Sequence, residues 1–416
     1  MSLQRISEEN YKLVMEGPIK FWIPKQKNKS SLNTSKKKDV PRKSDEVFYN
    51  SKQAFNREMS IFILKSWEGL VKPIESLFEP FCASGIRVLR YSIQGPRIGT
   101  IICNDLNFEA VELTKYNVNQ NRTKISSNIV FYNEEIRKLC ASLYKENQWF
   151  SVIDIDPFGS PQPFIHDSIR LLSNPGLFFV TATDMPVWVG KYPYKAYRRY
   201  GLTHFSFKNK SYCHEIALRA FIGYIQKEFI KQDQVAIPVV STSIDHYLRV
   251  AFYKKRGSTQ NIIQQTGFIG ECNQCYQRKT IPLISKNISE KSFICNCGST
   301  DTELIGPLWL GELHQDVFLS KIEDFLKNNS KENYSVIKRL QKYVSAKIEE
   351  NRIDTPWYFD LHWLSKKFRY SLPGTTSVVT LMRDAGFKVS ITHFTGTGIK
   401  TNAQFTDLKE VLLKEN

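Results

Sequence analysis

The segment with the clearest chemical potential is Val152–Pro161, which reads VIDIDPFGSP. Asp154 and Asp156 alternate with isoleucines, so on a strand both carboxylates point to the same side. Pro157 stiffens the turn after Asp156, and Phe158 is then presented at the rim. A carboxylate that accepts amine hydrogens beside a ring that stacks on a base suits alkylation of an exocyclic amine. An ordinary tight turn and a metal role for the two aspartates are the alternatives.

A second set of polar residues follows the strands that we expect earlier in the chain. The first strand runs into EPFCASGIRVLRY, a turn of small residues with only Gly85 and without the G-x-G-x-x-G of dinucleotide enzymes. Asp105 ends the next strand and is placed to accept hydrogen bonds from two ribose hydroxyls. Glu134 and Glu135 follow the third strand, where an adenine edge would lie. This order favours S-adenosylmethionine, although each acid alone is as readily a helix cap or a solvated carboxylate.

Four of the eight cysteines stand in two close pairs. Cys272 and Cys275 form a Cys-x2-Cys knuckle, and Cys295 and Cys297 follow after 19 residues. Two such pairs can close a tetrahedral zinc site with no open position, so we expect the metal to support folding rather than the reaction. Four reduced cysteines in a loop are the alternative.

The elements that must position these residues follow from the hydrophobic period. After a β-ribbon over 11–23 and a helix over 56–65, strands and helices alternate, which predicts a parallel sheet with helices on both faces. The predicted strands are 74–81, 97–104, 128–132, 149–155 and 176–183, and the helices between them are 107–119, 134–145 and 164–172. A helix over 214–229 and a strand pair over 234–241 and 247–254 would complete this region. The tail from residue 357 predicts a small winged-helix arrangement.

The composition indicates a polyanionic partner. Lys and Arg number 58 against 41 Asp and Glu, a net charge of +17, and an excess of this size attracts nucleic acid. Basic residues stand among aromatics in KYPYKAYRRY (191–200) and KKFRY (366–370), a mixture suited to stacking on unpaired bases and contacting phosphates. A basic surface without a partner is the alternative.

The remaining features exclude other classes of protein. A hydrophobic content of 41% excludes a disordered chain, and no apolar run of about 18 residues is present, so we expect no membrane span. The N-terminal residues lack an apolar signal region, which favours a cytoplasmic location. The polar stretch 25–46 predicts a loop or a basic arm, and no feature indicates an obligate protein partner.

Eight segments in order resemble the tRNA (guanine-26-N2) dimethyltransferase family, most closely its archaeal members. They are VFYNSKQAFNREMSI, FCASGIRVLRY, CNDLNFEAVELTKYNVNQN, IDIDPFGSP, VTATDM, CHEIALRAFIGYI, GPLWLGEL and THFTGTGIKT. The resemblance implies an α/β class I (Rossmann-like) methyltransferase domain over 1–257 and a smaller α+β tRNA-binding domain with the four-cysteine zinc site over 258–416. It also implies S-adenosyl-L-methionine as donor and a role in tRNA processing, with one and then two methyl groups transferred to N2 of guanine 26.

The resemblance also implies roles for single residues. Six positions match the family's cofactor site: Phe48, Arg57, Arg87, Asp105, Glu135 and Ile136. Among them, Arg57 looks like the ligand of the cofactor carboxylate, and Phe48 is similar to the aromatic beside the methyl group. Asp105 looks like the ribose acid, and Glu135 with Ile136 the pair at the adenine edge.

In the catalytic loop, Asp156 resembles the catalytic acid of the family and Phe158 the ring that stacks on the base. The chain departs from the family at Glu79 and Glu58, where aspartates are usual, and in the stretch Asp184-Met185-Pro186, which bears on the shape of the guanine pocket. Two other functions stay open. One is methylation of another exocyclic amine in RNA or DNA, and the other is a non-catalytic RNA-binding scaffold on the same fold.

Overall fold

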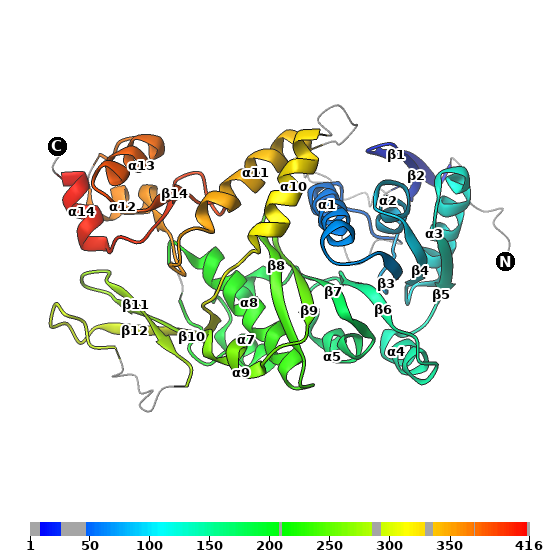
Figure 1. The fold of residues 1–416 in the computed structure, drawn as a ribbon, viewed down its shortest axis with the longest axis horizontal. Coiled ribbons are helices and arrows are strands. Elements are labelled where there is room, and N and C mark those ends of the chain that lie inside the picture. Colours follow the sequence, from blue (N-terminus) through cyan, green and yellow to red (C-terminus); the bar gives the residue numbers. More distant parts are fainter. Residues whose placement is uncertain are drawn as a thin grey trace, which may run out of the picture. The chain divides into compact units, whose positions relative to one another are not determined.

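The computed structural model describes residues 9–25, 47–207, 210–284, 293–328, 336–369 and 371–413 (Figure 1). The chain divides into two compact units. Unit 1 comprises Met1–Val180 and Lys321–Gln341, and unit 2 comprises Thr181–Ser320 and Lys342–Asn416. This division differs from the predicted boundary between residues 257 and 258, which stays a prediction. Residues 26–46 of the predicted polar stretch lie outside the described residues.

Unit 1 is built on parallel strands in the order β5-β4-β3-β6-β7. Their bounds are β3 (Ile74–Glu79), β4 (Ile98–Asn104), β5 (Asn128–Tyr132), β6 (Phe150–Ile155) and β7 (Leu172–Ala182). All residues of β6 are buried, because helices cover both faces of a parallel sheet. The strand order reverses between β3 and β6, and ligands of such sheets bind beyond the carboxyl ends of the strands at this point.

The helices of unit 1 lie on both sides of these strands, with α1, α2 and α3 on one face and α4 and α5 on the other (Figure 1). Their bounds are α1 (Ala54–Leu70), α2 (Ile86–Gln94), α3 (Phe108–Gln120), α4 (Ile136–Lys145) and α5 (Gln162–Arg170). The predicted ribbon is also present, as the antiparallel strands β1 (Tyr11–Glu16) and β2 (Ile19–Pro24). Apolar residues of β2, such as Phe21, pack against Ile86 and Leu89 of α2. The alternation predicted from the sequence is thus confirmed, and the unit has a Rossmann-like α/β arrangement.

Unit 2 contains the long helix α8 (Cys213–Ile230) and the predicted antiparallel pair β8 (Val235–Ile244) and β9 (Tyr247–Lys255). A second sheet has the order β11-β10-β12, and a third the order β13-β15-β14. The strands of these sheets are β10 (Thr266–Cys272), β11 (Arg278–Pro282), β12 (Thr302–Trp309), β13 (Phe359–Asp360), β14 (Val389–Ile391) and β15 (Gly398–Thr401). The sequence did not predict the sheet of β10, β11 and β12.

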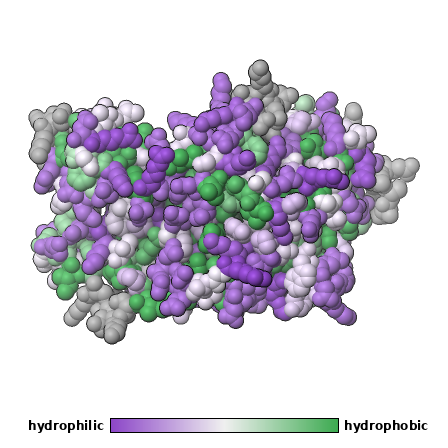
Figure 2. Space-filling model, viewed as in Figure 1, coloured by the Kyte–Doolittle hydropathy of each residue, from purple (hydrophilic) through white to green (hydrophobic). Residues whose placement is uncertain are grey.

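The other helices are mostly short. They are α6 (Met185–Trp188), α7 (Pro193–Tyr200), α9 (Thr259–Gln264), α10 (Asp316–Asn328), α11 (Ile337–Glu350), α12 (Leu361–Phe368), α13 (Thr375–Asp384) and α14 (Phe405–Leu413). The winged-helix arrangement of the tail stays a prediction. Within the described residues, none of these helices is long and apolar enough to cross a membrane. On the face shown in Figure 2, hydrophilic side chains predominate and apolar ones form small groups.

Candidate active site

The predicted catalytic loop leaves the carboxyl end of β6, next to the point where the strand order reverses. The side chain of Asp156 is 13% exposed and the Phe158 residue is 54% exposed. The ring of Phe48 lies edge-to-face against that of Phe158, with centroids 5.4 Å apart and planes at 89°. Gly159 has a φ of 86°, and a Cβ there would meet no atom within 4 Å. The structure therefore brings the two predicted aromatics together beside open space, beyond the carboxyl end of β6.

Arg87, in the first turn of α2, contacts the predicted catalytic loop. Its guanidinium donates to Oδ2 of Asp156 and lies 3.4 Å from Oδ2 of Asp154 and 3.7 Å from Oε2 of Glu79. Burial opposes the charge of Arg87, but Asp156 and Asp154 hold its pKa well above the usual value. Among the described residues, Asp156 uses only Oδ2 in these contacts. Arg87 therefore orients the carboxylate of Asp156 through Oδ2, and Oδ1 is left to accept a hydrogen bond from a ligand.

Two more carboxyl groups belong to this cluster, and the sequence analysis gave neither of them a role in it. Glu79 ends β3, whose parallel register with β6 continues from Phe78 opposite Ile153, and this places Glu79 beside Asp154. Burial, and next the charge of Asp154, raise the pKa of Glu79 well above the usual value. Asp154 in turn accepts a hydrogen bond of 2.5 Å from the hydroxyl of Tyr91. Arg87 lies closer to the two aspartates than to Glu79, so it pairs mainly with Asp154 and Asp156.

Arg57 of α1 lies in a different ion pair. Its Nε is 2.7 Å from Oε1 of Glu16, its Nη2 is 2.5 Å from Oε2, and Nη2 also donates to the carbonyl of Asn50 at 3.0 Å. Arg90 binds the same glutamate at 2.9 Å. Burial of Glu16 favours its neutral form, but Arg57 and Arg90 outweigh this and lower its pKa. The role of Arg57 as a ligand of the cofactor carboxylate stays a prediction, and Glu16 is a carboxylate partner that the sequence analysis missed.

Asp105 follows β4 and is tied to the turn after β3. Its Oδ2 accepts from the backbone N–H of Ala83 at 3.0 Å, and its Oδ1 accepts from that of Asn107 at 2.9 Å. Burial raises the pKa of Asp105, while these backbone groups oppose the shift. Leu106 directly after it is 72% exposed. This leucine is a further candidate for the site, and its signal in the sequence is an apolar residue directly after the acid at the end of a strand.

Glu135 and Ile136 lie at the start of α4. Glu135 caps this helix, because its Oε2 accepts from the backbone N–H of Lys138 at 3.2 Å, and its Oε1 pairs with Nε of Arg137 at 3.0 Å. Ile136 is buried. The helix cap was one of the alternatives for this acid, and the assignment of both residues to the adenine edge stays a prediction.

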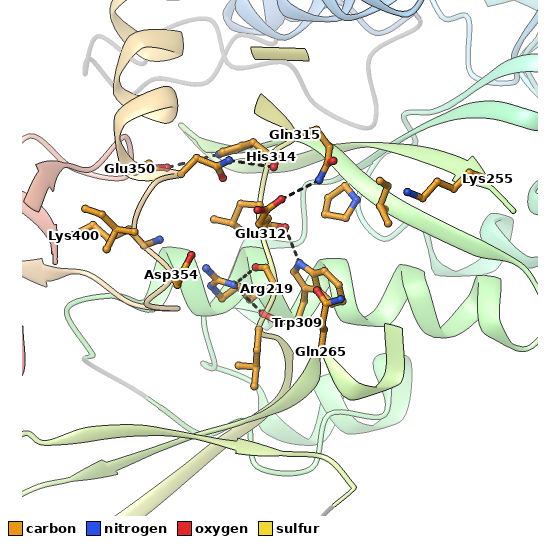
Figure 3. A pocket seen from close by; sticks show the side chains of 17 residues that line it. Arg219, Lys255, Gln265, Trp309, Glu312, His314, Gln315, Glu350, Asp354 and Lys400 are labelled. Carbon is orange, nitrogen blue, oxygen red and sulfur yellow. Dashed lines mark hydrogen bonds and ion pairs between the residues drawn. The ribbon is translucent and has the colours of Figure 1, made fainter. Parts of the chain in front are cut away.

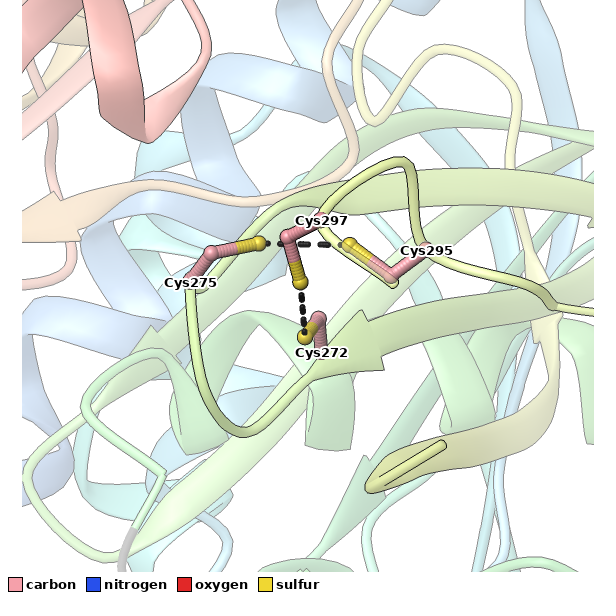
Figure 4. A group of neighbouring side chains, drawn as sticks. All are labelled: Cys272, Cys275, Cys295 and Cys297. Atoms are coloured by element: carbon pink, nitrogen blue, oxygen red, sulfur yellow. Dashed lines mark hydrogen bonds between the residues drawn. The ribbon is translucent and has the colours of Figure 1, made fainter. Parts of the chain in front are cut away.

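The four paired cysteines meet in unit 2 (Figure 4). Their sulfur atoms all lie within 4.8 Å of one another, with 3.7 Å between Cys272 and Cys297 and 3.2 Å between Cys275 and Cys295. Sulfurs at about 2.3 Å from a tetrahedral zinc are about 3.8 Å apart. Burial raises the pKa of the Cys272 thiol, but hydrogen bonds from the backbone N–H groups of Cys275 and Gln274 outweigh burial and lower this pKa to about 7. The donor set therefore fits a zinc ion, as predicted from the spacing.

A second group of possible metal ligands borders a cavity of about 510 Å³ in unit 2 (Figure 3). Nε2 of His314 is 3.7 Å from Oε1 of Glu350, and Nδ1 of His393 is hydrogen-bonded to the same oxygen. The backbone N–H of Ser241 donates to Nδ1 of His314 at 3.1 Å. A neutral His314 therefore carries its proton on Nε2 and has no lone pair there for a metal. This group is consequently a buried hydrogen-bond network rather than a metal site.

The comparisons with known proteins agree with this geometry. The family model described as N2,N2-dimethylguanosine tRNA methyltransferase matches residues 27–413. Proteins named tRNA (guanine(26)-N(2))-dimethyltransferase are 30% identical in Pyrobaculum islandicum, over 95% of this chain and 97% of the relative, and in Methanobrevibacter smithii, over 98% of each. The structure titled as a complex of Trm1 from Pyrococcus horikoshii with S-adenosyl-L-methionine has the same fold, with a TM-score of 0.79 and 24% identity, covering 96% of this chain and 99% of that one. The chain belongs to the N2,N2-dimethylguanosine tRNA methyltransferase family.

Proposed function

We propose that this protein transfers one and then two methyl groups from S-adenosyl-L-methionine to N2 of guanine 26 in tRNA. The family membership supports this function, and so do the names of relatives that match nearly the whole chain. The observation that carries it is the arrangement of Asp156, which Arg87 holds from behind, beside the rings of Phe158 and Phe48. A carboxylate next to an exposed aromatic ring is what recognition of a flat base with an exocyclic amine requires.

The residues around β4 fit the proposed donor. Asp105 presents a largely buried carboxylate after this strand, and the exposed Leu106 offers apolar surface beside it. A carboxylate at this place in a Rossmann-like sheet is suited to the hydroxyls of a ribose. When bound, the donor supplies an electrophilic methyl group on a sulfonium.

In the proposed reaction, Phe158 stacks on the guanine and fixes its plane. Asp156 accepts the hydrogens of N2, which directs the nitrogen lone pair toward the methyl group and stabilises the positive charge that develops on nitrogen. N2 would form the bond to the methyl carbon as the bond from that carbon to sulfur breaks, with its electron pair kept by sulfur. The proton that N2 then loses would pass to the carboxylate of Asp156, which already accepts this hydrogen, and from there to water. After the first transfer one N–H remains, so Asp156 can hold the amine for a second transfer.

The decisive experiment is mass spectrometry of nucleosides from tRNA that has been treated with the full-length protein and a methyl-labelled donor. Two transcripts that differ only at position 26, guanine against adenine, serve as substrate and control. The proposal expects labelled N2-methylguanosine followed by N2,N2-dimethylguanosine in the first transcript and no label in the second. Equal labelling of both transcripts would favour another exocyclic amine as the target. A protein that neither labels tRNA nor binds the donor in titration calorimetry would be a scaffold.

We further propose a structural zinc ion at Cys272, Cys275, Cys295 and Cys297, in support of residues 258–416 as a tRNA-binding domain. The convergence of the four sulfur atoms supports this proposal. The purified protein should contain about one zinc per chain, as expected for a closed site of four thiolates. Cys297→Ser should reduce that content and the melting temperature, whereas Cys213→Ser, outside the cluster, should retain the metal. A wild-type protein that is free of zinc after purification in zinc-containing medium would refute this site.

A further inference from the structure

We propose that the outer face of helix α7 binds an unpaired segment of the tRNA, an inference that rests on the proposed function. We define the α7 patch as Tyr192, Tyr194, Lys195, Tyr197 and Arg198. All of its residues belong to unit 2, and none of them has a role in the site built from β3, β4 and β6. The α7 patch would thus be a second tRNA-binding surface, separate from the residues that hold the reacting base.

The tyrosines of the patch are exposed to an unusual degree. Tyr194 is 90% exposed, Tyr197 is 63% exposed and Tyr192 is 49% exposed. Tyr194 and Tyr197 are three residues apart on one helix, as are Lys195 and Arg198, so each pair shares a face. An aromatic ring left in water contributes little to folding, because it buries little apolar surface. Three such exposed rings within six positions therefore indicate a binding surface rather than part of the hydrophobic core.

The opposite face of α7 fixes the helix firmly. Ala196 and Tyr200 are buried, and the ring of Tyr200 stacks on Trp188 with centroids 4.0 Å apart. The carboxylate of Asp184 accepts hydrogen bonds from the Tyr200 hydroxyl at 2.6 Å, from Nε1 of Trp188 at 2.9 Å and from Nη1 of Arg199 at 3.0 Å. The patch is therefore presented on a rigid support, which lowers the entropic cost of binding a ligand there.

The charge of this region complements a phosphate backbone. Residues 185–214 contain six Lys and Arg and no Asp or Glu. Asp184 pairs with Arg199, and Lys210 pairs with Glu271 and Glu303. Lys195 and Arg198, by contrast, take part in no ion pair within the part of the chain that the structure describes. Nζ of Lys195 lies 4.8 Å from the ring centroid of Tyr192, so cation and aromatic surface are presented together.

This combination selects an unpaired strand. In an A-form duplex the base faces are stacked on one another, and a protein contacts mainly phosphates and 2′-hydroxyls. A single strand leaves base faces open, so tyrosine rings can stack on them while lysine and arginine contact the adjacent phosphates. The exposed rings thus distinguish a loop or unstacked segment of tRNA from its stems.

The test compares two double variants, each of which replaces an exposed Tyr-Lys dipeptide in a different helix. Tyr194→Ser with Lys195→Ser removes the centre of the patch, and Tyr144→Ser with Lys145→Ser removes an exposed Tyr-Lys pair from α4 in unit 1. Affinity is measured with fluorescently labelled tRNA over a series of salt concentrations, and melting temperatures check the fold. We expect the first double variant to bind roughly 10- to 100-fold more weakly and the second to bind like the wild type.

Single variants separate stacking from charge. Tyr194→Phe should retain the affinity that Tyr194→Ser loses, because the ring is kept. Lys195→Ser should reduce the slope of log affinity against log salt by about 0.7, the value for one phosphate contact of a single strand. If the wild type methylates tRNA and the patch variant still binds like the α4 control, the α7 proposal alone is overturned. A wild type with no affinity for tRNA would overturn both proposals.

Discussion

Two buried groups of ionisable side chains make the most instructive comparison in this molecule. The Arg87 cluster in unit 1 consists of Arg87, Glu79, Asp154 and Asp156, and the His314 cluster in unit 2 consists of His314, Lys347, Glu350 and His393. Both groups place charges out of water at a cost in solvation. They differ in whether one of their side chains reaches the solvent.

In the Arg87 cluster, one carboxylate reaches the surface. Asp156 is partly exposed beside Phe158, and only one of its oxygens is used by Arg87. In the His314 cluster, by contrast, Glu350 accepts from Thr392 and from the backbone of His393, and Ser241 occupies Nδ1 of His314. Buried charge alone therefore does not mark a reaction site. Of the two clusters, only that of Arg87 offers a partly exposed carboxylate oxygen to a ligand, and the proposed reaction is placed there for this reason.

The largest effect on stability should come from Arg87→Gln. Removing the guanidinium leaves the buried carboxylates without their cation, and we expect a loss of about 3–5 kcal/mol in the free energy of unfolding. Arg137→Gln is the control, because it breaks the exposed pair with Glu135 and should cost less than about 1 kcal/mol. Urea unfolding of both variants measures the difference. Equal losses would show that Arg87 does not organise its cluster.

A smaller effect is expected at the exposed end of the same cluster. Phe158→Ala should weaken transition-state stabilisation by about 1–3 kcal/mol, the contribution of stacking on one base, and should leave the melting temperature unchanged. Phe158→Tyr should retain most of the activity because the ring is kept. The control is Tyr144→Ala, which removes another exposed ring. The ratio of kcat to KM for tRNA is the readout, and an undiminished ratio in Phe158→Ala would contradict a stacking role.

A third effect concerns the His314 cluster and depends on pH. Burial, together with the charge of Lys400, lowers the pKa of Lys347 to about 7, although Glu350 opposes the shift. Between about pH 7 and pH 10 the unfolded chain therefore binds a proton that the folded protein does not. Stability from this group rises with pH across that window, by at most about 1.4 kcal/mol per pH unit.

Lys347→Met removes this titration, whereas Lys342→Met on the exposed side of α11 keeps it. Chemical unfolding at several pH values should thus give a flatter pH dependence for Lys347→Met than for the wild type and Lys342→Met. Parallel curves for all three proteins would mean that Lys347 is charged in the folded state, and the His314 cluster would then be an ionic cluster like that of Arg87.

The sequence predicted local features well. Strand β5 agrees in both bounds with the predicted 128–132, and Asp156 and Phe158 follow the end of a strand as expected. These features were predictable because the alternation of a strand and the turn at a proline depend only on neighbouring residues. Helix α7 was not predicted, since tyrosines and basic residues interrupt any apolar stripe in Lys191–Tyr200.

Long-range pairings were also missed. Glu16 meets Arg57 from 41 positions away, and Arg87 meets Asp156 from 69 positions away. Such contacts between long side chains of separate elements form only when the sheet is assembled, so no local sequence pattern predicts them. The four paired cysteines form the exception among the distant groups, because the spacing of paired cysteines is itself a local signal.

The most direct test of the central claim is the single-turnover rate of methyl transfer by Asp156→Asn, with donor and tRNA both saturating. Asparagine keeps the size of the side chain but lacks the charge and one of the two acceptor oxygens. The account predicts a rate about 10²–10³-fold below that of the wild type, with tRNA affinity retained. A variant that transfers the methyl group at the wild-type rate would contradict the role of this carboxylate.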